Sequence, residues 1–135
     1  MALNLKAPFF LAQAAARPMR AQGAGKIVNL ADIAAERPWP GYLPYCISKA
    51  GIVALTRGLA RALAPQIQVN ADAPGTVLFP ESMPKEERER LLQPVPLQRE
   101  GKDTDVARAV RFLLEGSDYI TGVVLPVDGG RSVAG

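Results

Sequence analysis

Three short apolar runs alternate with longer amphipathic segments, and this alternation limits the fold more than any other feature of the chain. The short runs cover residues 26–30, 67–71 and 122–127, and each has the length of a strand. The longer segments, residues 2–22, 45–64 and 103–115, place apolar side chains at helical spacing. Because strands that alternate with helices usually run parallel, we predict an α/β fold with three parallel strands and flanking helices.

The predicted sheet is small for an independent domain, because parallel strands need both faces and both edges covered. Residues 32–44 contain Pro38, Pro40 and Pro44 and predict a loop, and residues 81–92 predict a short charged helix. The chain shows no internal repeat and no linker. We therefore expect residues 1–135 to form one partial domain.

Composition excludes several classes of function. The chain has no His and a single Cys, which excludes Ser-His-Asp and Cys-His catalysis, HExxH zinc sites and an internal disulfide. Its Lys and Arg residues stand singly among apolar residues, which argues against nucleic-acid binding. Lys6, Gln13 and Arg17 interrupt the first apolar stretch. We therefore expect neither a membrane span nor a secretory signal, and predict a cytoplasmic protein without a metal site.

Tyr45 and Lys49 stand four residues apart at the start of a predicted helix, on one helical face. An ammonium group near a phenol favours the phenolate, so we expect Lys49 to lower the pKa of Tyr45. Such a phenol can serve as a general acid. The competing interpretation is a structural Tyr followed by a solvated Lys, and the pair alone does not decide between the two.

The wider pattern around this pair resembles the short-chain dehydrogenase/reductases. The matching segments are Ile27-Val28-Asn29, Tyr45-x-x-x-Lys49-Ala50, Val69-Asn70, Pro74-Gly75 and Asp128-Gly129-Gly130. This resemblance implies a doubly wound, Rossmann-like parallel sheet that binds a nicotinamide cofactor at the carboxyl ends of its strands. The family's Gly-rich TGxxxGxG turn is absent from the chain. We therefore expect the C-terminal half of such a fold, without the N-terminal dinucleotide-binding half.

The resemblance implies a catalytic group of Asn4, Asp32, Tyr45 and Lys49. Asn4 fits the family's Asn position on the helix before the central strand. Asp32 stands thirteen residues before Tyr45, where the family usually has Ser, and this departure resembles the pteridine reductases. A carboxyl group can accept, donate and relay protons, whereas a hydroxyl group can only bridge or polarise a substrate oxygen. The competing interpretation of Asp32 is a cap on a turn.

The resemblance also implies the cofactor contacts. It implies NADPH, with NAD as the alternative, because the residues that decide between them lie in the absent half. The nicotinamide end would be held by Tyr45, Lys49, Pro74, Gly75, Thr76 and Val77. Residues 79–92 would form a substrate lid, and Trp39 and Tyr42 would border the substrate unless they serve only in packing. Asp72 occupies a position that is usually apolar in the family, and the resemblance gives it no role.

Three functions are compatible with this pattern. The first is a pteridine reductase that moves hydride from NADPH to a dihydropterin or dihydrofolate, with protons supplied by Tyr45 and Asp32. The second is a ketoreductase of the 3-oxoacyl-carrier-protein type. The third is a truncated, non-catalytic fragment, because nothing in the chain would hold the adenine and pyrophosphate.

The resemblance further implies a homo-oligomer, either a dimer or a tetramer, in which the helices from Asn4 and Tyr45 pair across a two-fold axis. The isolated chain would also expose the strand edge at residues 27–30. We therefore expect obligate association or poor solubility.

Overall fold

The structure is a computed structural model that describes residues 2–135, with side-chain surroundings from residue 4 onward. Its centre is a sheet of three parallel strands in the order β1 (Gly25–Leu30), β2 (Ile67–Pro74) and β3 (Val124–Val127). In the central strand β2, Asn70 lies opposite Val28 of β1, and Asp72 lies opposite Leu125 of β3. The predicted three-stranded parallel sheet is confirmed.

The central strand runs three residues beyond its predicted end at Ala71. Asp and Pro are poor strand formers, so Asp72 and Pro74 argued for an earlier end. Pairing with β3 carries the strand on to Pro74, which lies opposite Val127. The third strand is shorter than predicted, because Gly122 adopts a left-handed φ of 79° and donates its N–H to the Val69 carbonyl from a turn.

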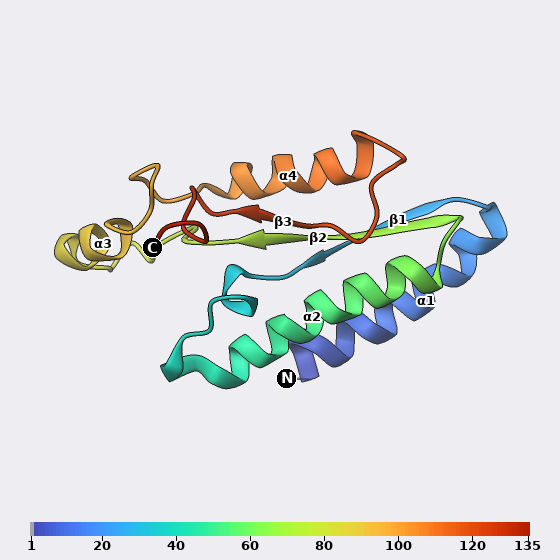
Figure 1. The fold of residues 1–135 in the computed structure, drawn as a ribbon, viewed down its shortest axis with the longest axis horizontal. Coiled ribbons are helices and arrows are strands. Elements are labelled where there is room, and N and C mark those ends of the chain that lie inside the picture. Colours follow the sequence, from blue (N-terminus) through green and yellow to red (C-terminus); the bar gives the residue numbers. More distant parts are fainter. Residues whose placement is uncertain (1) are drawn as a thin grey trace.

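Helices cover both faces of the sheet (Figure 1). The helices α1 (Ala7–Gln22) and α2 (Leu43–Ala62) lie on one face, and α4 (Asp103–Glu115) lies on the other. A π-helical turn (Ala2–Lys6) precedes α1. The short helix α3 (Lys85–Leu92) lies beyond the carboxyl ends of the strands, and none of its residues is buried.

The loop predicted at residues 32–44 contains two single 3-10 turns, Ile33–Ala35 and Pro40–Tyr42. The first of these turns buries Ile33 and Ala34 and so ties the loop to the core. The second is led by Pro40, whose ring suits the first position of a helical turn. The loop is therefore anchored where it leaves β1, whereas its second turn, next to α2, buries no residue.

The core lies between β2 and the pair formed by α1 and α2. Two apolar clusters fill it, one of Ala31, Ile33, Ile52, Val53, Ala71 and Ala73 and one of Ala16, Ala60, Leu63, Ile67 and Val69. The helix α2 turns Cys46, Val53 and Ala60 inward at a spacing of seven residues. Ile47, which its helical spacing predicts to be buried, lies off this line and is 55% exposed. Within residues 2–135, no helix combines the length and apolarity that crossing a bilayer would require.

Candidate active site

Asp32 and Tyr45 meet at the carboxyl end of the sheet. Asp32 follows β1 and caps the 3-10 turn after it, because its Oδ1 accepts the Ala34 N–H at 2.8 Å. Tyr45 lies in the first turn of α2 and donates its hydroxyl to Asp32 Oδ2 at 2.6 Å. Asp32 therefore caps a turn and also contacts the phenol, so the two interpretations of this residue are compatible.

The surroundings of Tyr45 oppose ionisation of its phenol. Burial raises the pKa of Tyr45 above its ordinary value of 10.0, and the hydrogen bond to the Asp32 carboxylate raises it further. The net shift is therefore opposite to the one expected from Lys49 alone. The Lys49 Nζ lies 5.7 Å from the centre of the Tyr45 ring and does not bond to the hydroxyl. Burial, and after it the Asp32 carboxylate that accepts the hydroxyl hydrogen bond, set the pKa of the phenol instead.

Lys49 lies one turn along α2 and reaches back to β1. Its Nζ donates to the Leu30 carbonyl at 3.0 Å, which leaves further ammonium protons free for another acceptor. Burial lowers the pKa of Lys49, and the attraction of Asp32 opposes this effect. Lys49 thus faces the same carboxyl end of β1 as the pair of Asp32 and Tyr45.

Asn4 joins this group through a residue for which the sequence suggested no role. The Asn4 amide lies 3.5 Å from Ser48 Oγ, and this buried hydroxyl donates to the Tyr45 carbonyl at 2.6 Å. Ser48 therefore bridges Asn4 and the turn that carries Tyr45. The only sequence signal for it is its place between Tyr45 and Lys49 on the helix.

Asn4 and Lys49 also line one open groove of about 430 Å³ that follows the outer edge of β1. The wall of this groove is mostly apolar and includes Leu11 of α1, Ile27 and Leu30 of β1, and Ile52 of α2. A groove of this kind suits a ligand with both an apolar part and hydroxyl or carbonyl groups.

The predicted segment Pro74–Val77 leaves β2 at the same carboxyl edge. Gly75 is needed there for close packing, because a Cβ at this position would lie 2.6 Å from Asp128 Cβ and 3.2 Å from Ile33 Cδ1. Through Ile33 this segment packs beside the turn that Asp32 caps. Val77 forms an isolated parallel bridge with Gly101, which closes the base of the loop between them.

The loop predicted as a lid is held at its base by polar contacts. Glu100 accepts the Phe79 N–H at 3.0 Å and lies 3.5 Å from Arg88. Arg88 also donates to the Pro80 carbonyl and stacks over the Phe79 ring. Trp39 and Tyr42 pack edge to face against each other, with ring centres 6.2 Å apart. The structure thus supports a packing role for these two aromatics.

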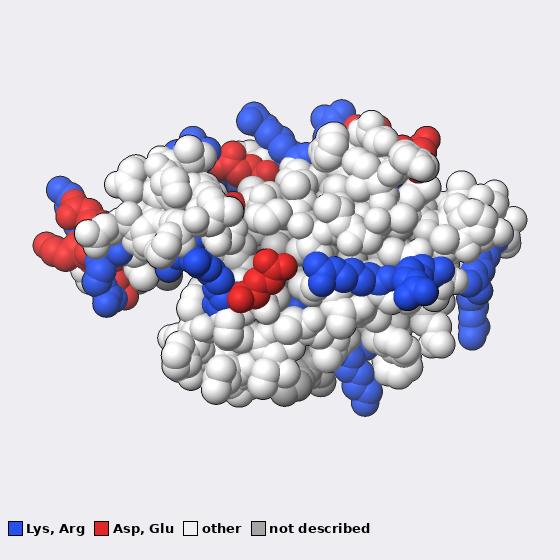
Figure 2. Space-filling model, in the orientation of Figure 1, with Lys and Arg blue, Asp and Glu red and all other residues white. Residues whose placement is uncertain are grey.

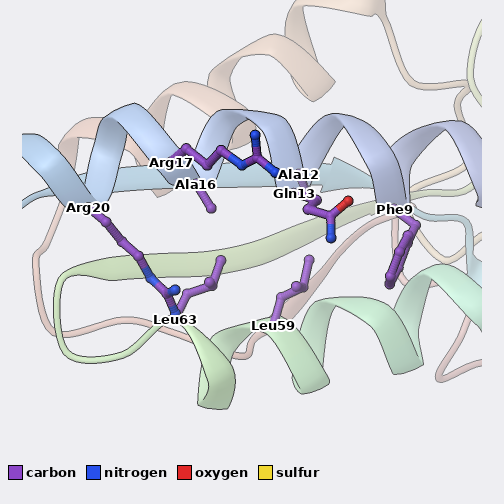
Figure 3. Close-up of a pocket in the computed structure, with 8 residues that line it drawn as sticks. All are labelled: Phe9, Ala12, Gln13, Ala16, Arg17, Arg20, Leu59 and Leu63. Carbon is purple, nitrogen blue, oxygen red and sulfur yellow. The ribbon is translucent and has the colours of Figure 1, made fainter.

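Two other surfaces do not belong to this group. A pocket of about 260 Å³ lies between α1 and α2, where Ala16, Leu59 and Leu63 face one another and Arg17 and Arg20 lie beside them (Figure 3). On the face drawn in Figure 2, Lys and Arg side chains form a band across the middle beside an acidic side chain, and near α3 they lie among acidic side chains. Among the residues that the structure describes, no cluster of His, Cys, Asp or Glu could hold a metal ion.

Comparison with known proteins places the chain among reductases. A family described as enoyl-(acyl carrier protein) reductase matches residues 1–132. The 3-oxoacyl-[acyl-carrier-protein] reductase of Staphylococcus aureus is 40% identical over 131 residues, which cover 94% of this chain and 53% of that protein. Human dehydrogenase/reductase SDR family member 4 is 39% identical over 134 residues, 95% of this chain and 48% of that protein.

A solved structure agrees in fold as well. A Sinorhizobium meliloti protein assigned as a short-chain alcohol dehydrogenase superposes with a TM-score of 0.90 at 37% identity, over 97% of this chain and 54% of that one. The chain spans about half the length of the curated relatives it matches.

Proposed function

Because the chain belongs to the short-chain dehydrogenase/reductase family, we propose that it carries the proton-transfer part of an NAD(P)H-dependent reductase, corresponding to the C-terminal half of the whole fold. The contact of Tyr45 with Asp32, beside Lys49, is the observation that carries this proposal. The names of the relatives favour a ketoreductase, the second function considered above, over a pteridine reductase. We therefore take a 3-oxoacyl thioester as the first candidate substrate.

The residues present fit the nicotinamide end of the cofactor. Lys49 uses one ammonium proton on Leu30 and keeps others for a ribose hydroxyl. Because Gly75 has no side chain, the backbone there lies close to Asp128 and Ile33. In this position the following residues, Thr76 and Val77, can lie along the edge of the flat nicotinamide ring. When bound, the nicotinamide supplies the hydride. NADPH and NAD remain alternative donors in this proposal.

Tyr45 has the proton that a newly formed alkoxide needs. The raised pKa keeps the phenol protonated at neutral pH, as a general acid must be before it acts. In the structure this proton points to Asp32, so a substrate oxygen must replace Asp32 as the acceptor. Lys49 then stabilises the phenolate that remains, because it lies over the same ring.

The contact between the Asp32 carboxyl and the Tyr45 hydroxyl supports the second candidate, reduction of a dihydropterin. In pterin reduction the ring nitrogen gains a proton as the hydride reaches the ring carbon. A carboxyl group beside a phenol can supply that proton. Ser in place of Asp32 separates the candidates. A ketoreductase should keep or gain turnover in Asp32→Ser, because the phenol loses its charged acceptor, whereas pterin reduction should fall at least tenfold.

The test begins with NADPH titration by calorimetry of the 135-residue chain and of a polypeptide extended upstream of Met1. We expect binding only by the extended form, which is then assayed with an acetoacetyl thioester and with a dihydropterin, together with Tyr45→Phe and Asp32→Ser. Tyr45→Phe should lower turnover at least a hundredfold. Full turnover by Tyr45→Phe would remove Tyr45 as the acid, and binding by the short chain would refute the need for the other half.

A further inference from the structure

Asp72 lies in the middle of the molecule with nothing bound to its carboxylate. It belongs to the central strand β2 and is fully buried. Its neighbours Ala71 and Ala73 pack against α2, so alternation along the strand turns Asp72 toward α4. Both Asp72 oxygens lack a hydrogen-bond partner, and no other buried side-chain oxygen or nitrogen does so among the residues described. Buried carboxylates without partners are rare, because each loses its hydration without compensation.

The strands beside Asp72 offer only apolar side chains at its level. Its register partners are Leu30 in β1 and Leu125 in β3. The face of α4 that is turned from solvent consists of Asp105, Val106, Ala109, Val110 and Leu113. The carboxyl group of Asp72 is therefore held between a sheet and a helix that are both mainly aliphatic there.

The charged groups on the elements around Asp72 are engaged elsewhere. Asp105, the one titratable residue on the sheet-facing side of α4, bonds to Arg99 and to the Lys102 N–H. Lys26 of β1 pairs with Asp118 at the other end of the strand.

Two further charged residues lie on α4 or next to β3. Asp128, just beyond β3, accepts the N–H groups of Gly130 and Ser132, and Arg108 of α4 is exposed. The strand β3 itself carries no charge. Among the residues whose surroundings the structure describes, no neighbouring cation therefore compensates an ionised Asp72.

Burial raises the pKa of Asp72 from 3.8 to about 6, and the nearby Ala73 backbone N–H opposes part of this rise. A carboxyl whose pKa is raised on folding stabilises the fold fully below pH 3.8, and this stabilisation is lost as the pH rises through about 6. The chain has no His, so no imidazole titrates in the same interval. Asp105, Asp118 and Asp128 have the opposite pH dependence. Hydrogen bonds to these three carboxyls lower their pKa values, although burial opposes this effect.

We propose that Asp72 is a proton-operated switch between the sheet and α4. With the carboxyl protonated, α4 packs closely on β2. With the carboxyl ionised, the helix loosens so that water reaches the charge. The released elements are α4 and its connection to β3, whereas α1 and α2 on the opposite face stay packed. This inference does not depend on the proposed function.

The test is urea unfolding of the 135-residue chain from pH 4 to pH 8, with Asp72→Val as the variant and Asp118→Asn as the matched control on the surface. We expect the ratio of folded to unfolded chain to fall roughly a hundredfold across this range for the unchanged chain and for the control, as two pKa units require. Asp72→Val should show no such fall. Parallel curves for the unchanged chain and Asp72→Val would overturn the proposal.

Two further measurements locate the effect. Carbon NMR of labelled Asp side chains should show one carboxyl that titrates near pH 6 and is missing in Asp72→Asn. Hydrogen exchange, corrected for its intrinsic pH dependence, should show that amides of α4 open more often above pH 6 while those of α2 do not. Titration of every Asp below pH 5, or equal opening of α2 and α4, would refute the switch.

Discussion

At the scale of single residues, the Asp32 carboxylate accepts a hydrogen bond from the Tyr45 phenol. Asp32 receives both the Ala34 N–H and the Tyr45 hydroxyl, so one side chain shapes the loop and governs the candidate acid. This double role ties the reactivity of Tyr45 to the residue at position 32.

Replacing Asp32 by Asn should therefore lower the pKa of Tyr45. The variant removes the negative charge and the strong acceptor, which both raise that pKa now. Ultraviolet titration of tyrosinate should show one phenol that ionises at lower pH than in the unchanged chain. Tyr45→Phe identifies the signal, and Tyr42→Phe serves as the control. An unchanged titration in Asp32→Asn would mean that burial alone sets the pKa of Tyr45.

A second residue, Gly75, should not tolerate even one added methyl group. The new Cβ would overlap Asp128 Cβ and Cα, which belong to a different segment. Gly75→Ala should therefore lower the free energy of unfolding by about 2 kcal/mol, as overpacking does. Gly58→Ala is the control, because nothing lies within 4 Å of its added Cβ. Equal stability of both variants in urea would show that the turn can move aside.

At the scale of elements, a buried polar contact fixes α2 against β1. The Asn29 amide donates to Thr56 Oγ1 at 3.0 Å, and this hydroxyl donates to the Ile52 carbonyl of its own helix. Both side chains are buried, so the pairing selects one rotation of α2 on the sheet. This rotation is also the one that leaves Ile47 in solvent.

Thr56→Val should lower the free energy of unfolding by about 2 kcal/mol, because the Asn29 amide is left buried without an acceptor. Thr56→Ser, which keeps the hydroxyl, should recover more than half of this loss. The comparison is made by urea denaturation at pH 5, below the titration of Asp72. A variant Thr56→Val as stable as Thr56→Ser would mean that water replaces the lost acceptor.

At the scale of the whole molecule, β1 is an edge strand with free backbone groups. The N–H groups of Gly25 and Ala31 point to β2, so alternation turns those of Val28 and Leu30 outward. The Leu30 side chain is 57% exposed at this edge, and Lys49 occupies only the Leu30 carbonyl. Such an edge can pair with another strand.

We therefore expect the 135-residue chain to associate, and Leu30→Lys to weaken this association at least tenfold. Sedimentation velocity over a range of concentrations measures it. Phe112→Lys is the control, since Phe112 is similarly exposed on α4, away from the edge. A monodisperse monomer of the unchanged chain that melts cooperatively would contradict the expectation, which is separate from the oligomer that the family resemblance implies.

The sequence by itself determined the order of the elements, and its family resemblance proposed the residues of the candidate site. Periodic apolar residues and short β-branched runs are local signals, so the three parallel strands and the helix at Asp103–Glu115 could be predicted from them. The grouping of Asp32 with Tyr45 rested on that resemblance, because the thirteen-residue spacing alone left Asp32 open to interpretation as a turn cap.

Only the tertiary structure decided how these residues act. The length of β2 depends on pairing with β3, the exposure of Ile47 depends on how α2 lies on the sheet, and the direction of the Tyr45 pKa shift depends on the contact with Asp32. The isolation of Asp72 is of the same kind, because it requires every neighbouring element to be in place. Spacing along the chain records which residues share a face, whereas pKa values and burial depend on what packs against that face.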